Sequence, residues 1–266
     1  MTRREVASAK NPIVQRFRDA AAGKVEGVLL AEGVRLVAEA LDAGLAVVDA
    51  AASPRCGDRA LVDRLADTAA AFYDCTDDVL ARMSQLETSP GVAALVRVPR
   101  FADDELLRPA VGGSPLVVVA AGVRDPGNLG SVVRTAEAAG ASSVLAMAGG
   151  ADPFRDKAVR GSMGSVFRLP VRHGLDAAAV AAFAAAHRLQ LVVADGAGEV
   201  AHTAADLRQP TLLVVGAEAA GVPEALRRAA ALRVRIPIHP PVESLNVAVA
   251  CGVLLFEAHR QRAAAR

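Results

Sequence analysis

Apolar runs alternate with amphipathic stretches along the whole chain, and this alternation predicts strands that are each followed by a helix. Before Pro99, the pattern predicts helices at 4–22 (broken near Asn11 and Pro12), 34–43, 58–70 and 77–86. The strands predicted between them lie at 28–31, 46–51, 71–74 and 92–98. An alternating α/β unit of this size can form a domain of its own.

The residues from Pro99 to Pro115 are rich in proline, glycine and charge, which is typical of a linker. The apolar run LVVVAAG that follows favours a parallel strand covered on both faces. Later strands are predicted at 143–148, 189–194, 211–215 and 232–236, and helices at 129–139, 176–186, 223–230 and 244–262. We therefore expect an α/β protein with a small domain at 1–99, a linker at 100–114 and a parallel-sheet domain at 115–266.

Composition narrows the function only slightly. The net charge of +1 does not point to nucleic acid, although a local basic patch can still bind it. Arginine greatly outnumbers lysine, which suits bidentate phosphate contacts, but a GC-rich coding bias explains it as well. Cys56, Cys75 and Cys251 lie too far apart for a disulfide framework or a zinc site. The chain shows no signal core and no membrane span, so we expect a soluble, reduced, cytoplasmic protein.

Loops rich in glycine or charge follow the strands of the second half, at 122–130, 195–198, 216–224 and 237–246. Open α/β sheets bind ligands at the carboxyl ends of their strands, so we expect these loops to meet at one edge. The spacing of Gly122, Gly127 and Gly130 is not that of a dinucleotide fingerprint, and no P-loop motif is present. A nucleotide-dependent enzyme is therefore only weakly supported.

Three short blocks occur in order in the second half: Asn128-x-Gly130-x-x-x-Arg134-Thr135-Ala136, Gly216-Ala217-Glu218-x-x-Gly221, and Ile236-Pro237 with Ser244-Leu245-Asn246-Val247. Together they resemble the three motifs of the SpoU (TrmH) family of RNA 2′-O-ribose methyltransferases. The segments 8–12, 31–34 and 39–41 resemble the substrate-binding domain that often precedes that catalytic domain. This domain is similar to the ribosomal L30e-type RNA-binding fold.

The resemblance implies a sheet with a trefoil knot, a homodimer formed through the knotted domain, and a bent S-adenosylmethionine as the methyl donor. Glycines let backbone groups approach such a ligand closely, and prolines stiffen the loop around it. The residues that would hold the cofactor by this resemblance are Asp195, Gly196, Gly216, Ala217, Gly221, Ile236, Ile238, Ser244, Leu245 and Asn246.

The resemblance places the chemistry on Arg134, Asn128, Glu218 and Asn246. A guanidinium does not deprotonate in proteins, so we expect Arg134 to stabilise the developing 2′-alkoxide rather than to act as a base. Structural alternatives stay open for its neighbours. Asn128 can cap the helix that begins after it, and Glu218 can be an ordinary surface residue. Ser244 is a good helix N-cap, whereas capping explains Asn246 less well.

The candidates for RNA contact are basic residues and one serine: Lys10, Arg16, Arg124, Arg155, Arg160 and Ser162. Ordinary solvated charge and a Gly/Ser turn are the alternatives. His239 with its two following prolines departs from the family pattern, and the histidines show no metal spacing, so no metal is expected.

The N-terminal domain favours 23S rRNA as substrate, with tRNA as the alternative. A catalytically silent RNA-binding or ribosome-assembly protein of this fold is the other alternative.

Overall fold

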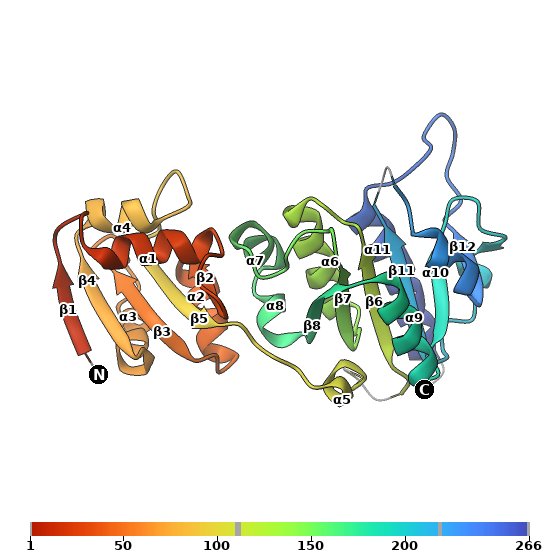
Figure 1. Cartoon of the computed structure of the whole chain (residues 1–266), viewed down its shortest axis with the longest axis horizontal. Coiled ribbons are helices and arrows are strands. Elements are labelled where there is room, and N and C mark those ends of the chain that lie inside the picture. The colour runs from red at the N-terminus through yellow and green to blue at the C-terminus, as the bar shows by residue number, and fades with distance from the viewer. Residues whose placement is uncertain (1, 110–112, 218–219, 265–266) are drawn as a thin grey trace. The chain divides into compact units, whose positions relative to one another are not determined.

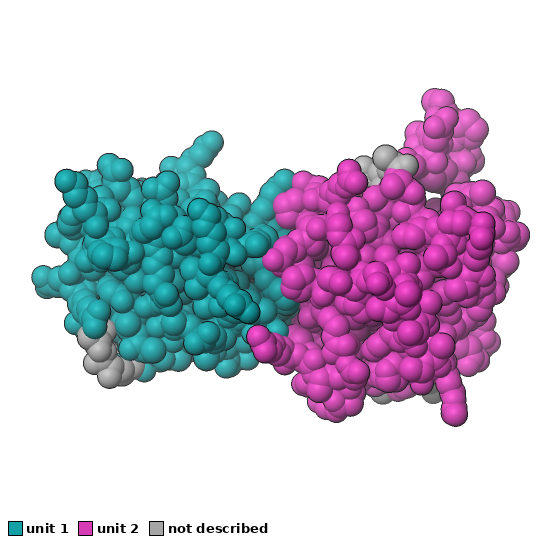
Figure 2. All heavy atoms as spheres, viewed as in Figure 1, with its two compact units in different colours: residues 1–99, 154–168 teal, residues 100–153, 169–266 magenta. Residues whose placement is uncertain are grey.

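The computed structural model describes residues 2–109, 113–217 and 220–264. These residues form two compact units (Figures 1 and 2). One unit contains residues 1–99 with 154–168, and the other contains 100–153 with 169–266. Each unit has its own sheet and its own hydrophobic core.

The first unit is built on a five-stranded mixed sheet in the order β1-β4-β3-β5-β2. These strands are β1 (Thr2–Val6), β2 (Val28–Glu32), β3 (Val47–Ala52), β4 (Ala71–Cys75) and β5 (Val92–Arg97). The helices are α1 (Pro12–Ala21), α2 (Val34–Asp42), α3 (Arg59–Thr68) and α4 (Asp77–Met83). Helices α1 and α4 bury Phe17 and Leu80 in one core with alternate strand residues such as Leu95. This confirms the predicted smaller α/β domain.

The helix predicted from residue 4 is wrong in its first half, because Thr2–Val6 is a strand. This strand pairs in parallel with β4, from Thr2 opposite Ala71 to Val6 opposite Cys75. The helix begins only at Pro12, where the side chain of Asn11 accepts a hydrogen bond from the N–H of Ile13 at 3.0 Å. A five-residue edge strand with polar side chains carries too little periodicity to be distinguished from a helical turn.

The second unit contains a seven-stranded, all-parallel sheet in the order β10-β12-β9-β11-β6-β7-β8. Its strands are β6 (Leu116–Ala121), β7 (Ser143–Met147), β8 (Val171–Leu175), β9 (Gln190–Ala194), β10 (Val200–Ala201), β11 (Thr211–Gly216) and β12 (Leu232–Arg235). Its helices are α5 (Asp103–Leu106), α6 (Pro126–Ala138), α9 (Ala177–Ala186), α10 (Glu224–Ala229) and α11 (Val247–Ala264), with a short 3₁₀ turn at His202–Ala204. The predicted parallel-sheet class is confirmed.

Helices cover this sheet so that its central strands are buried. Val117 and Val119 of β6 lie in a core cluster with Val180 of α9 and Leu226 of α10. Because side chains alternate along a strand, Val118 points to the opposite face, and it is also fully buried. Helix α11 packs against α6 and β11. All strands run the same way, so the loops after β9, β11 and β12 reach one edge of the sheet, where the start of α11 also lies (Figure 1).

Besides β1, the sequence did not predict two helices and two strands of the structure. Helices α7 (Asp156–Ser162) and α8 (Ser165–Arg168) are short and belong to the first unit, although the chain on both sides of them belongs to the second. Strand β8 carries an arginine, a histidine and a glycine, and β10 has two residues. None of these segments contains enough apolar positions for a period to be recognised.

Candidate active site

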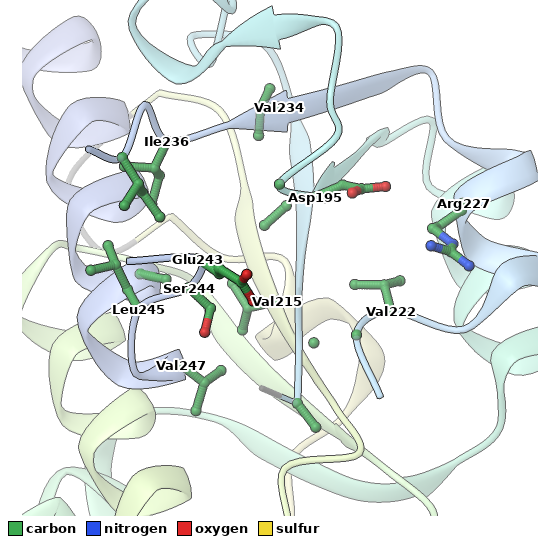
Figure 3. A pocket seen from close by; sticks show the side chains of 17 residues that line it. Asp195, Val215, Val222, Arg227, Val234, Ile236, Glu243, Ser244, Leu245 and Val247 are labelled. Atoms are coloured by element: carbon green, nitrogen blue, oxygen red, sulfur yellow. The ribbon is translucent and has the colours of Figure 1, made fainter. Parts of the chain in front are cut away.

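A cavity of about 190 Å³ lies at the carboxyl edge of the seven-stranded sheet (Figure 3). A single buried water needs about 10–15 Å³, so this cavity admits a much larger molecule. It is lined by the ends of β9, β11 and β12 and by the loop that leads into α11. Nine of the ten residues expected to hold the cofactor line it: Asp195, Gly196, Gly216, Ala217, Gly221, Ile236, Ile238, Ser244 and Leu245. Asn246 is the exception.

The loop after β11 closes tightly on itself beside the cavity. The N–H of Gly221 donates to the carbonyl of Ala217 at 2.7 Å, and the N–H of Ala217 donates to Ala121 at 3.0 Å. A Cβ on Gly216 would lie 2.3 Å from the backbone carbon of Gly221, closer than any real contact, so only glycine fits there. Glu218, which the sequence places in this loop, lies outside the described residues.

The loop after β12 presents backbone groups to the same cavity. Among the residues that the structure describes, the N–H groups of Ile238, Ser244 and Leu245 form no hydrogen bond. All three residues line the cavity, so their backbone donors can serve a ligand. His239 is exposed and lies outside the cavity lining.

Sequence reasoning missed several residues of the cavity wall. The apolar ones include Val215, Val222 and Val234, which ordinary strand patterns hide among other core residues. Two charged residues were also missed, Glu243 and Arg227, and no motif marks either of them. Asp195, which was expected, accepts a hydrogen bond from the N–H of Ala197 at 2.9 Å and lies 3.3 Å from the guanidinium of Arg233.

Neither of the two helix caps that the sequence offered, Asn128 and Ser244, is the observed cap. Helix α6 begins at Pro126, and its cap is Asp125, whose carboxylate accepts from the N–H of Asn128 at 2.8 Å. Helix α11 begins at Val247, and its cap is Asn246 rather than Ser244. The carbonyl oxygen of the Asn246 side chain accepts from the N–H groups of Ala248 at 3.0 Å and Val249 at 3.4 Å. An Asp-Pro pair is a strong start signal for a helix, which is why α6 begins earlier than expected.

A hydrogen bond joins two residues that the sequence assigns to the chemistry. The amide nitrogen of Asn246 donates to the side-chain oxygen of Asn128 at 3.0 Å. Because the oxygen of Asn246 is committed to the start of α11, its nitrogen must face Asn128, which must then accept through its oxygen. The amide N–H₂ of Asn128 is thereby left available to donate hydrogen bonds. The residue that orients it, Asn246, lies 118 positions later in the sequence.

Arg134 lies further along α6 and is exposed. Within the described part of the chain, its guanidinium forms no hydrogen bond and no ion pair. The Cα–Cβ bonds of a helix tilt toward its N-terminus, so the Arg134 side chain starts out toward the end of α6 that carries Asn128. The geometry thus brings the loop after β12, Asn246 and the first turns of α6 together at one site.

The candidates for RNA contact fall into two groups. Arg124 is exposed in the second unit, and Lys10 is exposed in the first. The others are engaged within the first unit. Arg16 pairs with the buried Asp49 at 2.7 Å, the guanidinium of Arg155 fills the space beside Gly23, and Arg160 pairs with Asp156.

Ser162 is fully buried, and its hydroxyl is already used inside the protein. It donates to the carbonyl of Val159 at 2.8 Å and accepts from the N–H of Val166 at 3.5 Å. These bonds hold α7 to α8, which is the turn role that the sequence left open for this residue.

Other reactive groups give no sign of a second chemical centre. Burial raises the pKa of the Cys251 thiol to about 12 and that of Cys75 to about 11, so neither is a nucleophile near neutral pH. In the ranges that the structure describes, no three His, Cys, Asp or Glu side chains are grouped as metal ligands would be. None of the helices in those ranges is both long and apolar enough to cross a membrane.

Comparisons with known proteins agree with this geometry. Residues 115–256 match the SpoU rRNA Methylase family, and residues 14–94 match the MRM3-like substrate binding domain. An uncharacterized tRNA/rRNA methyltransferase of Synechocystis is 31% identical over 265 residues, which cover 98% of this chain and 95% of that protein. The Bacillus subtilis 23S rRNA (guanosine(2553)-2′-O)-methyltransferase RlmP is 31% identical over 266 residues, which cover 95% of this chain and 98% of RlmP.

A solved structure shares the whole architecture. The AdoMet-bound rRNA methyltransferase of Sinorhizobium meliloti superposes with a TM-score of 0.87 at 31% identity, covering 97% of this chain and 98% of that one. The chain therefore belongs to the SpoU rRNA methylase family.

Proposed function

We propose that this protein transfers a methyl group from S-adenosylmethionine to a ribose 2′-hydroxyl of 23S rRNA. The observation that carries the proposal is the cavity at the sheet edge, which adjoins the Asn246–Asn128 pair and, through α6, Arg134. Family membership supports the reaction class. The RlmP name supports the choice of 23S rRNA over tRNA.

The lining of the cavity suits S-adenosylmethionine in its chemistry. Val215, Val222 and Ile236 offer apolar walls for the adenine ring, and the donors of Ile238 and Leu245 can meet its nitrogens. The carboxylate of Glu243 offers a negative charge to the cationic part of the ligand. When bound, S-adenosylmethionine supplies the electrophilic methyl group.

The acceptor oxygen needs help, because a ribose hydroxyl is a weak nucleophile at neutral pH. In our proposal Arg134 stays protonated and donates hydrogen bonds to the 2′-oxygen as negative charge develops on it. The free amide N–H₂ of Asn128 holds the ribose or a flanking phosphate. The new bond joins the 2′-oxygen to the methyl carbon, the carbon–sulfur bond breaks, and the proton leaves to a phosphate oxygen or to water.

For the RNA, we propose that the first unit binds the substrate and the second performs the reaction. Lys10 and Arg124 are the candidates that are exposed and form no ion pair within the described structure. Arg16 and Arg160 already neutralise Asp49 and Asp156, so we expect smaller effects from them. The trefoil knot and the cytoplasmic location stay predictions.

We further propose that the protein is a homodimer joined through α11. Val249 and Phe256 are 54% and 51% exposed, and their spacing of seven residues places them on one face of this helix. Val242, in the loop before it, is 54% exposed as well. Large apolar side chains grouped on a surface in this way are typical of a protein interface.

The test of the proposed reaction is methyl transfer from radiolabelled S-adenosylmethionine to 23S rRNA by the purified protein. Arg134→Ala should lower the transfer rate by roughly 10²–10³-fold, as loss of one oxyanion donor does. Cofactor affinity should be unchanged. Arg208→Ala is the matched control, because Arg208 is an exposed arginine of the same unit that pairs with Asp206. A near-normal transfer rate of Arg134→Ala would show that Arg134 does not stabilise the 2′-oxygen in the reaction. Cofactor binding without transfer by the wild type would favour a silent RNA-binding protein.

A further inference from the structure

Arg227 is a charged residue of the cavity wall that no motif marks. It lies on α10, and its side chain is 41% exposed. Among the described residues that line the cavity it is the only cation, whereas Asp195 and Glu243 are both acidic. Figure 3 shows its guanidinium on the side of the cavity opposite Ser244 and Leu245.

The charges of S-adenosylmethionine can be matched to these residues one by one. The ligand carries two cationic groups, the sulfonium and the ammonium, and one anionic group, the α-carboxylate. A carboxylate placed near Asp195 or Glu243 would be repelled, while a guanidinium binds a carboxylate through two parallel hydrogen bonds. Electrostatic complementarity therefore directs the carboxylate to Arg227.

The position of Arg227 agrees with this assignment. In the proposed reaction the methyl group faces the side of the cavity that carries Ser244, next to Asn246 and the start of α6. The α-carboxylate is at one end of the ligand, several bonds from the sulfur, so it can reach the opposite wall. We propose that Arg227 binds the α-carboxylate of S-adenosylmethionine and thereby selects the intact amino-acid part of the cofactor. This assignment rests on the proposed function.

The neighbours of Arg227 hold it in place and provide a control. Glu224, one turn earlier on α10, lies 2.8 Å from the guanidinium of Arg227 and 2.9 Å from that of Arg228. Arg228 is 80% exposed and does not line the cavity. The two arginines thus share a helix and one carboxylate, so the trio keeps a net positive charge that a ligand carboxylate can meet. Only Arg227 borders the ligand space.

The experiment measures ligand binding by calorimetry, with no RNA present. S-adenosylhomocysteine carries the α-carboxylate, and 5′-methylthioadenosine keeps the adenosine and the sulfur but lacks the amino-acid part. Arg227→Ala should weaken the binding of S-adenosylhomocysteine by about five- to tenfold, the lower end for a hydrogen bond to a charged group, since the site is partly exposed. It should leave 5′-methylthioadenosine within about twofold. Arg228→Ala should bind both ligands as the wild type does.

A third ligand tests the contribution of the α-carboxylate charge alone. Decarboxylated S-adenosylmethionine should bind Arg227→Ala no more weakly than it binds the wild type, because the anionic group that Arg227 recognises is missing and only cationic groups remain. Arg227→Gln serves as a second variant, and matching thermal unfolding temperatures show that the variants fold.

Two results would overturn the assignment alone. One is wild-type affinity of Arg227→Ala for S-adenosylhomocysteine. The other is an equal loss for 5′-methylthioadenosine, which would mean that Arg227 recognises the adenosine part. If the folded wild type binds none of these ligands, the proposed function fails, and the assignment fails with it.

Discussion

Asn246 has two structural tasks at once. Its side-chain oxygen accepts a hydrogen bond from an N–H group in the first turn of α11. Its side-chain nitrogen donates to Asn128 on α6 and so fixes the orientation of that amide. An aspartate or a serine would cap a helix equally well, but neither carries an amide N–H₂. What asparagine adds at this position is therefore the bond to Asn128, not the helix cap.

This leads to a prediction that separates the two tasks. Asn246→Ala should lower the free energy of unfolding by about 1 kcal/mol, the usual cost of a lost cap, and should also reduce methyl transfer. Asn246→Asp should keep the stability, because a carboxylate accepts the same N–H groups. It should still reduce transfer, because Asn128 would turn its amide to donate to the new carboxylate. Urea unfolding and transfer assays check both. Full activity of Asn246→Asp would show that the Asn246–Asn128 bond has no part in the reaction.

Individual residues also show which parts of the site could be predicted from the sequence and which could not. The loops that line the cavity could be predicted because glycines and prolines mark backbone geometry that other residues cannot adopt, as at Gly216. Arg227 and Glu243 could not be predicted, because neither belongs to a motif. Arg227 reaches the cavity through the packing of α10, and Glu243 reaches it through the path of the loop before α11. The capping roles of Asp125 and Asn246 depended on helix starts that shifted by about one turn, a typical error of periodicity.

At the scale of elements, long apolar runs were predicted well and short polar ones were not. Strand β6 has six consecutive buried residues, and all six are apolar, so the composition alone predicts a buried strand. Strand β1 has one buried apolar residue, Val6, and becomes a strand because β4 offers an edge to pair with. Tertiary pairing of this kind is invisible to a local pattern.

The loop after β11 provides an element-scale prediction. Gly216→Ala would push a Cβ into the backbone of Gly221 and Val222, at 2.3 Å and 2.5 Å, so the loop must shift away from its closed form. We expect cofactor affinity to fall by at least tenfold, measured by calorimetry, because the cavity wall moves with the loop. Gly57→Ala is the control, since its added Cβ meets nothing within 4 Å. Unchanged affinity in Gly216→Ala would show that this loop does not shape the site.

At the scale of the whole molecule, the chain passes between its two units three times. The segment 154–168 belongs with residues 1–99, where Gly164 and Arg168 both contact Glu39. The sequence predicted a single passage at the linker, because composition marks a boundary only where the chain is polar and rich in proline. A return by two short helices leaves no such mark.

The apolar face of α11 gives the prediction for assembly. Phe256→Asp should convert the proposed homodimer to a monomer, because a carboxylate cannot be buried without a partner. Multi-angle light scattering measures the mass directly. Ala182→Asp, at an exposed position of α9, adds the same charge elsewhere and should leave the dimer intact. A wild-type monomer, or a dimer that survives Phe256→Asp, would contradict the proposed interface.

The central claim is ribose methylation of 23S rRNA with Arg134 at the reaction centre. Mapping of 2′-O-methyl groups on all rRNA and tRNA, in cells with and without the gene, tests it most directly. We predict that deletion removes a 2′-O-methyl group from 23S rRNA, that the wild-type gene restores it, and that Arg134→Ala does not. Loss of a tRNA site alone, no lost site, or restoration by Arg134→Ala would contradict the account.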